Sequence, residues 1–300
     1  MQRFPMKRIF LVMLIVAFSF DPAISQEKIP DLENVRIITT HVAGPIYMLE
    51  ATGDVAGNIA VSAGPDGILL VDTQFAPLAD SIRTALDRFI DGNIEYIVNT
   101  HHHTDHTHGN ANLGKSAIII GHSNARKRLS RVVEEARPKI TFNNQISIHF
   151  NDEEIKVIHY PHGHTDNDVV VFFTESNVVH LGDLWNSGIS SFPTVDLEAG
   201  GSIMGMLKNI EDLIRIIPED AHIIPGHYAL SDLRDLKRTR EMLVETIGLV
   251  KRKKAAGMSL EKIKKEGFPA KYDGWGTAYT SSATWIENIY HGLEYKPNKE

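Results

Sequence analysis

Short apolar runs separated by turn residues fill the first quarter of the chain. Runs of about four to eight residues rich in branched and aromatic side chains are typical of β-strands. The runs that fit this description are 35–40, 46–50, 58–63 and 67–71. Gly64-Pro65-Asp66-Gly67 separates the last two runs and predicts a hairpin turn. The segment 51–57 contains one sizeable apolar residue, Val55, and we predict that it forms a hairpin tip.

Helical spacing alternates with strands in the rest of the chain. Apolar residues recur four apart from Leu78 to Ile90 and predict a helix over 77–90. Further helices are predicted over 123–136, 203–217 and 232–256. The remaining predicted strands are 94–98, 117–120, 145–150, 155–159, 169–173, 178–181 and 222–224.

Each half of the chain therefore shows several strands followed by helices. Sheets that are apolar on one face must bury that face against another layer. We predict an α/β fold of four layers, αββα, in which two sheets pack face to face with helices outside. Trp285 and Tyr290 predict a final helix that docks through its aromatic face, so the domain 26–300 would end in a helical extension.

The N-terminus has the pattern of a signal peptide. Arg3, Lys7 and Arg8 precede an apolar run over 9–20, and Ala23-Ile24-Ser25 supplies small residues for cleavage after residue 25. A membrane anchor is the alternative, but the run is shorter than the roughly 20 residues that a span needs. We expect residues 1–25 to be removed, leaving no stable membrane span, and the product to be periplasmic or secreted.

Composition excludes some classes of protein. The hydrophobic fraction of 42% and charged fraction of 23% are those of a soluble globular protein. The net charge of -7 argues against a nucleic-acid partner, which requires clustered Lys and Arg. The chain has no cysteine, so an exported product must be held together by its core and by any metal that it binds.

A histidine-rich string after the predicted strand 94–98 is the strongest chemical signal. His101, His103, Asp105 and His106 form an H-x-H-x-D-H pattern, and zinc takes imidazole and carboxylate ligands where no thiolate is offered. Alternate residues of an extended backbone point the same way, so His101 and His103 can converge on one ion. Asp105 and His106 lie further along, in place for a second ion.

Three more candidate ligands follow predicted strands elsewhere in the chain. They are His164, Asp183 and His227, and each lies next to a glycine that lets the backbone approach closely. Loops at strand ends are where a rigid scaffold places its working residues. We therefore expect these side chains to meet the histidine string in space.

These strings together resemble the motif set of the metallo-β-lactamase superfamily, within 46–228. The C-terminal string Gly274-Trp275-Gly276-Thr277, followed by Trp285 and Tyr290, resembles that of the periplasmic cyclase or quinoprotein-relay hydrolases of the same superfamily. The resemblance implies a metallo-β-lactamase sandwich with two Zn²⁺ ions, or Fe or Mn in their place. It implies that His101, His103 and His164 hold the first metal. Asp105, His106 and His227 would hold the second metal, and Asp183 would bridge both. Asp72 matches an acidic supporting position, or is an ordinary turn residue.

The expected activity is hydrolysis of a small molecule. A metal-activated hydroxide, oriented by Asp105 as the catalytic residue, would attack the carbonyl of a cyclic amide or ester, β-lactams included. Asp183 stands where the β-lactamases carry cysteine or serine. Asn186 stands where one group of them carries a lysine that binds the substrate carboxylate. Both differences argue for lactones and thioesters as alternative substrates. Candidate substrate contacts are Val55, Trp185, Asn186 and Tyr228, with Phe192, if they do not belong to the core.

Two other classes of protein stay open at this point. One is a mononuclear-iron oxidoreductase of the persulfide dioxygenase kind, which can dispense with the second site. The other is a zinc-binding protein without turnover, although structural zinc sites are closed by four protein ligands. The sequence leaves the oligomeric state open.

Overall fold

The computed structural model describes residues 29–187, 191–276 and 280–294. The predicted signal peptide, 1–25, lies outside the described residues. Within these described ranges, no helix has both the length and the apolar character that crossing a membrane requires.

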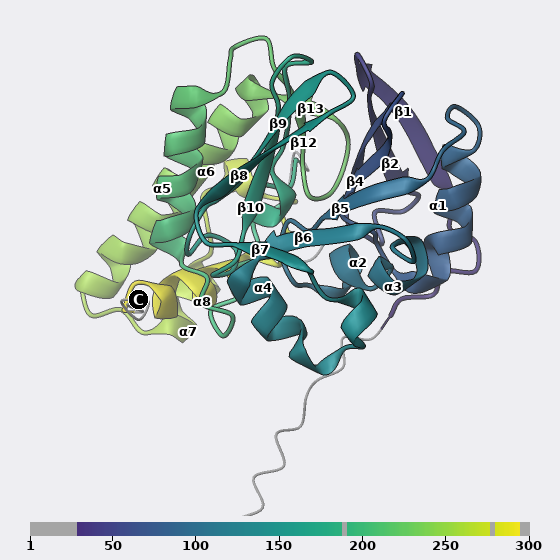
Figure 1. Ribbon diagram of the computed structural model, residues 1–300. Coiled ribbons are helices and arrows are strands. Elements are labelled where there is room, and N and C mark those ends of the chain that lie inside the picture. Colours follow the sequence, from purple (N-terminus) through teal and green to yellow (C-terminus); the bar gives the residue numbers. More distant parts are fainter. Residues whose placement is uncertain (1–28, 188–190, 277–279, 295–300) are drawn as a thin grey trace, which may run out of the picture.

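The first sheet has seven strands in the order of the sequence (Figure 1). Neighbours from β1 to β4 are antiparallel, whereas β4 to β7 run parallel to one another. The strands are β1 (Ile37–Ala43), β2 (Ile46–Ala51), β3 (Ile59–Gly64), β4 (Gly67–Val71), β5 (Ile94–Val98), β6 (Ile118–His122) and β7 (Ile140–Phe142). The carboxyl ends of β4 and β5 therefore lie at one edge of the sheet.

The second sheet has six strands in the order β13-β12-β11-β10-β9-β8. Its neighbours are antiparallel except for β11 and β12, which are parallel. The strands are β8 (Gln145–Phe150), β9 (Glu153–His159), β10 (Val169–Phe173), β11 (Val178–His180), β12 (His222–Ile224) and β13 (Ser231–Asp232). The ends of β11 and β12 are thus side by side.

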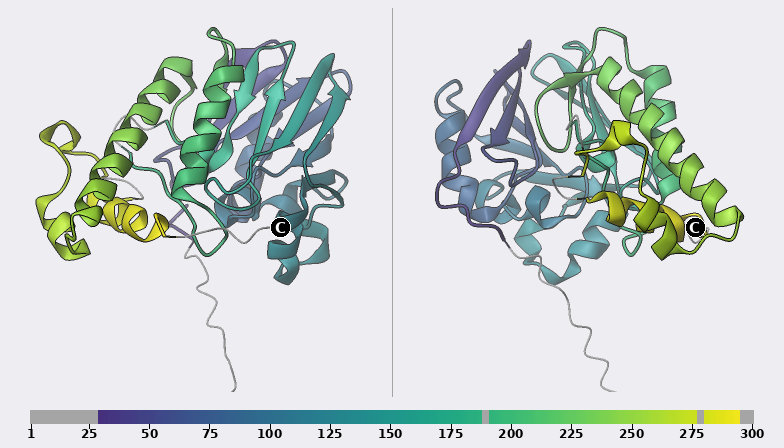
Figure 2. Two further views of the ribbon diagram at one scale, coloured as in Figure 1. Left: turned by 90° about the vertical axis from the view of Figure 1, so that its left-hand side faces the viewer. Right: turned by 180° about the vertical axis from the view of Figure 1, so that it is seen from behind.

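Helices cover the outer faces of the two sheets (Figures 1 and 2). Helix α1 (Ala79–Leu86) packs on the first sheet, whereas α5 (Ile203–Ile216) and α6 (Leu233–Ala255) pack on the second. Helices α7 (Leu260–Glu266) and α8 (Ser282–Gly292) join this outer layer, where Trp285 is fully buried and donates from Nε1 to Thr246 Oγ1 at 3.1 Å. The predicted four-layer α/β fold is confirmed.

Alternate residues of the inner strands pack on opposite layers. Leu69 and Val71 of β4 lie between the sheets, while Leu70 faces the α1 side. In the same way Val171 of β10 lies between the sheets and Val170 faces the helices of the second sheet. Burial of each such side chain stabilises the fold by about 1.5–3 kcal/mol. Both faces are buried, so these strands read as continuous apolar runs.

Two predicted helices differ from the structure. The helix predicted over 123–136 ends early, because α4 spans only Ser123–Arg128 and short 3₁₀ turns follow. Val132 is extended, and the guanidinium of Arg137 donates to its carbonyl, so that carbonyl is not used in a helix. The helix predicted over 77–90 begins as a 3₁₀ turn and its α-helical part, α1, ends at Leu86. The short strands β7 and β13 were not predicted.

Candidate metal centre

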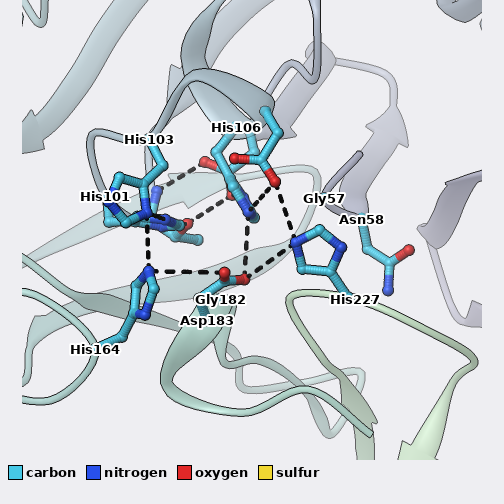
Figure 3. Close-up of polar contacts among 12 residues, drawn as sticks. Gly57, Asn58, His101, His103, His106, His164, Gly182, Asp183 and His227 are labelled. Atoms are coloured by element: carbon cyan, nitrogen blue, oxygen red, sulfur yellow. Dashed lines mark hydrogen bonds and ion pairs between the residues drawn. The ribbon is translucent and has the colours of Figure 1, made fainter. Parts of the chain in front are cut away.

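The candidate ligands come from strand ends of both sheets and meet at one edge of the sandwich (Figure 3). His101 follows β5, Asp183 follows β11 and His227 follows β12. His164 lies on the loop between β9 and β10. The fold therefore brings together side chains that are far apart in the sequence.

Three imidazoles form the first cluster. His101 Nε2 lies 3.0 Å from His103 Nδ1, and His164 Nε2 lies 2.9 Å from the same Nδ1 atom. His101 and His164 are each 1% exposed. Three imidazole nitrogens that face one another at such short distances are suited to a shared cation.

Asp105, His106 and His227 form the second cluster. Asp105 Oδ2 lies 3.6 Å from His106 Nε2 and 3.2 Å from His227 Nε2. Both imidazoles are buried, whereas the Asp105 side chain is 21% exposed. The second cluster therefore has one carboxylate that solvent or a small molecule can reach.

Asp183 lies between the two clusters and turns one oxygen to each. Oδ1 is 3.3 Å from His106 Nε2 and 3.6 Å from His227 Nε2, whereas Oδ2 is 3.7 Å from His164 Nε2. This single carboxylate is the link between two sets of ligands (Figure 3).

The histidine string changes conformation in its middle. The backbone of the string is extended as far as His103, and Thr104–Thr107 then forms one helical turn, α2. This turn places Asp105 beside His106 and His227, and it holds the His106 ring centroid 4.3 Å from that of His101. The two clusters are therefore adjacent, and His106 also gathers with His101 and Asp183.

Asp72 holds two residues of the histidine string in place through its carboxylate. Its fully buried carboxylate accepts hydrogen bonds from the backbone N–H of Thr100 at 2.8 Å and from Thr100 Oγ1 at 2.6 Å. It also lies 2.8 Å from His106 Nδ1. A partner on the outward nitrogen of a ligand imidazole fixes the ring and its tautomer. Asp72 is therefore a supporting residue as well as a strand-end residue.

Other outward nitrogens have partners as well. His101 Nδ1 lies 3.1 Å from Thr100 Oγ1. His103 Nε2 lies 3.0 Å from Asp196 Oδ2, and His164 Nδ1 lies 2.7 Å from the Thr194 carbonyl. Sequence reasoning missed Thr194 and Asp196, because no spacing or motif marks them.

A buried network of amide side chains lies next to the backbone of the histidine string. Asn110 Nδ2 donates to Asn99 Oδ1 and to the Ala136 carbonyl, each at 2.9 Å. Asn110 Oδ1 accepts from Asn99 Nδ2 at 3.1 Å and from Thr73 Oγ1 at 2.9 Å. Thr73 Oγ1 also lies 3.2 Å from the His106 carbonyl. The network connects the helical turn of His106 to the ends of β4 and β5.

The two clusters differ in the charge that their side chains favour. Burial, together with neighbouring imidazoles, lowers the pKa of His101 well below its usual range and that of His164 to about 4. In the second cluster burial opposes charge, but the nearby carboxylates, Asp183 first among them, raise the pKa of His227 to about 10. His101 and His164 of the first cluster thus favour the neutral form, whereas His227 of the second cluster favours the charged form beside its carboxylates.

The residues offer ligand atoms that fit bound metal cations. His106 Nε2 and Asp183 Oδ1 are buried, and within the described part of the chain neither atom has a hydrogen-bond partner. Buried polar groups almost always have partners, so each exception calls for a reason. Imidazole nitrogens and carboxylate oxygens are zinc ligands, and a cation held by the second cluster would satisfy both atoms.

A cavity of about 620 Å³ opens onto the two clusters. Of the candidate substrate contacts, Val55, Asn186 and Tyr228 line it, together with Asp54 and Phe75. Trp185 does not line it, so that expectation is corrected: Trp185 is 2% exposed, packs in the core beside α6 and donates from Nε1 to Thr239 Oγ1 at 2.8 Å. Phe192 is likewise a core residue.

The hairpin tip between β2 and β3 is fastened to the His227 loop. Asn58 Nδ2 donates to the Tyr228 carbonyl at 2.7 Å, and Asp54 Oδ1 accepts from the Tyr228 N–H at 3.0 Å. Asp54 Oδ1 also lies 3.5 Å from His227 Nδ1, a contact that no sequence signal indicated. The hairpin tip also approaches His106 closely at Gly57, where a Cβ would overlap the His106 ring (Figure 3).

Curated relatives match part of the chain. A hydroxyacylglutathione hydrolase from Prochlorococcus marinus is 31% identical over 180 residues, which are 55% of this chain and 65% of that protein. A hydroxyacylglutathione hydrolase from Pelagibacter ubique is 28% identical over 137 residues, 45% of this chain and 52% of that protein. The chain thus spans less than two thirds of the length of these relatives.

Solved structures share the fold at low sequence identity. A metallo-beta-lactamase from Pontibacter korlensis superposes with a TM-score of 0.58 at 16% identity, over 69% of this chain and 99% of that one. A stereoselective inverting sec-alkylsulfatase from Pseudomonas sp. superposes with a TM-score of 0.71 at 13% identity, over 86% of this chain and 50% of that one. These likenesses support the fold only.

The family follows from the match of the sequence to a family model, which covers residues 52–247 and thus more than half of the chain. The matched range contains all seven candidate ligands and the strands that carry them. The fold and the motif order agree with this match. The chain belongs to the metallo-beta-lactamase superfamily.

Proposed function

We propose that this protein is a two-metal hydrolase, with zinc as its metal, that cleaves the carbonyl–heteroatom bond of a small cyclic amide or ester, β-lactams included. The observation that carries the proposal is the position of Asp183, whose two oxygens face different ligand clusters. A site for one metal has no use for a second complete cluster, so this geometry favours two metals over one.

His101, His103 and His164 would hold the first ion, Asp105, His106 and His227 the second, and Asp183 would contact both. Such a pair supplies Lewis-acid activation of a carbonyl and of water at neutral pH. The chain itself must orient the water that the metals would activate. Asp105 is suited to this role, because it is the more exposed of the two candidate ligand carboxylates that line the cavity, and its Oδ2 is held 3.2 Å from His227 Nε2.

The cavity wall indicates how a substrate would be held. Its volume of about 620 Å³ suits a small molecule. Val55 and Phe75 offer apolar contacts. Asn186 Oδ1 is buried and, among the described residues, has no hydrogen-bond partner, so it is available to accept from an N–H or O–H group of a ligand. Hydrolysis of lactones or thioesters is the alternative within this proposal, in line with the names of the curated relatives.

The test begins with metal analysis of the purified mature protein. We expect two zinc ions per chain, and hydrolysis of at least one member of a panel of chromogenic β-lactam, lactone, thioester and phosphodiester substrates. Dialysis against a strong chelator should abolish turnover, and added zinc should restore it. One iron and no zinc would instead indicate an oxidoreductase, and full activity in the metal-free protein would refute the proposal.

We also propose that the protein is exported. The proposal rests on the sequence of residues 1–25, with its cationic start, apolar run and small residues before the cleavage point. Amino-terminal sequencing of protein recovered from the periplasm or medium should begin at Gln26. Full-length protein in the cytoplasm, or retained in the membrane, would contradict the proposal.

A further inference from the structure

The segment from Thr194 to Asp196 touches two imidazoles of the first cluster. Asp196 Oδ2 lies 3.0 Å from His103 Nε2, and the Thr194 carbonyl lies 2.7 Å from His164 Nδ1. The Asp196 N–H also donates to the His164 carbonyl at 2.8 Å. One short loop segment thus contacts both His103 and His164, although it contributes neither of them.

The contact with Asp196 determines which nitrogen of His103 can bind a metal. A neutral imidazole carries one N–H group and one lone pair. An ionised carboxylate accepts hydrogen bonds only, so the N–H group of His103 belongs at Nε2, facing Asp196. The lone pair is then at Nδ1, which lies 3.0 Å from His101 Nε2 and 2.9 Å from His164 Nε2. The carboxylate therefore sets the tautomer that the first cluster requires.

The carboxylate is itself fixed in place. Asp196 Oδ1 accepts from the Ala199 N–H at 2.8 Å, and the Asp196 carbonyl accepts from the Gly201 N–H at 2.8 Å. Val195, next to it, is buried in the core of the second sheet. With one oxygen committed to the backbone, the other is left to face His103.

We propose that Asp196 is a positioning residue that sets the metal affinity of the first cluster by fixing the ring and tautomer of His103. It acts through the outward nitrogen and is not itself one of the seven ligands. In the described part of the chain, the ligand imidazoles that this segment contacts through their outward nitrogens are His103 and His164, so the effect should be largest at the first site. This inference rests on the metal site of the proposed function and does not depend on the substrate.

Asp196→Asn is the informative substitution, because an amide has nearly the same shape. If its oxygen keeps the Ala199 contact, its NH₂ group faces His103 Nε2 and favours the tautomer with the proton on Nδ1, which blocks the metal-binding nitrogen. If the amide turns the other way, its NH₂ group faces the Ala199 N–H, and two donors then lie opposite each other without an acceptor. Glu198→Gln is the matched control, since Glu198 is exposed on the same loop and loses the same charge.

Two readouts test the inference. Competition with a chromophoric chelator should show first-site zinc affinity about 10–100-fold weaker in Asp196→Asn than in wild type, with the second site and Glu198→Gln little changed. In metal-free protein, ¹⁵N NMR of the imidazoles should place the His103 proton on Nε2 in wild type and shift it toward Nδ1 in Asp196→Asn. A thermal unfolding curve close to that of wild type would show that the loop still folds.

Unchanged zinc affinity together with an unchanged His103 tautomer would overturn the inference. A metal content of three ions per wild-type chain that falls to two in Asp196→Asn would also overturn the inference. Asp196 would then be a metal ligand itself, together with His102 and His103, because the ligand atoms of these three residues lie within 4.8 Å of one another. Failure of the proposed function is read separately, from wild-type metal content and turnover, while the NMR comparison still decides the role of Asp196.

Discussion

Removal of the Asn110 side chain is the sharpest test of how the metal site is supported. Asn110 is fully buried at the start of α3 (Asn110–Leu113), and its side chain makes hydrogen bonds to Asn99, Thr73 and the Ala136 carbonyl. Its amide satisfies every donor and acceptor that it carries. Buried networks of this kind strengthen a fold when complete and weaken it when one member is lost.

The magnitude follows from the groups that Asn110→Ala leaves behind. Both polar atoms of the Asn99 side chain and the Ala136 carbonyl each lose a partner. A buried polar group left without a partner costs about 1–3 kcal/mol. Water entry and local relaxation recover part of the sum, so we expect the free energy of unfolding to fall by about 3–5 kcal/mol.

Urea unfolding of the metal-free protein measures this loss without interference from metal binding. Asn112→Ala is the control, because Asn112 is the same residue type on the same short helix but is exposed. It should change the free energy of unfolding by less than about 0.5 kcal/mol. If Asn110→Ala were also within about 1 kcal/mol of wild type, the network would not support the site as we describe, since even one orphaned group should cost that much.

Four further substitutions test other parts of the account. Asp105→Asn should leave the unfolding midpoint near that of wild type while kcat falls about 10²–10⁴-fold, and near-normal turnover would remove Asp105 from the mechanism. Asp183→Ala should lower the metal content measured after desalting from two ions to one or none, and retention of two would show that Asp183 does not link the clusters. Gly57→Ala should destabilise the fold and weaken second-site zinc binding, because its Cβ would overlap His106. Gly248→Ala, in the middle of α6 where only the flexible end of Arg252 is near, should instead raise stability by about 0.5–1 kcal/mol in the same unfolding assay.

Much of the fold could be predicted from the sequence, because its strands are buried on both faces. Strands such as β4 and β10 have neighbours in two layers, so every residue in them is apolar and the run is easily recognised. The error over 123–136 has a tertiary cause. Arg128 reaches Asp166 on the loop after β9, and Arg126 and Arg137 both bind Glu134. Contacts of this kind shape the segment after α4, and helical periodicity does not report them.

The gathering of the candidate ligands could be predicted because they lie in short strings at strand ends, several of them beside glycines. The supporting residues could not. Asp54, Thr194 and Asp196 act across loops that meet only in the folded chain, and a lone acidic residue or a backbone carbonyl has no spacing to reveal it. Trp185 shows the opposite case, in which closeness to a ligand in sequence suggested the cavity whereas the side chain points into the core.

Because the candidate ligands come from both sheets, metal binding would affect the stability of the whole fold. A cation pair at this edge would act as a cross-link between the two halves of the sandwich, in a chain that has no disulfide. Free metal at about a thousand times its dissociation constant would add about 4 kcal/mol to the unfolding free energy. Metal depletion would then weaken the interface between the two sheets first. Proteases would therefore cleave the metal-free protein faster than the metal-bound protein.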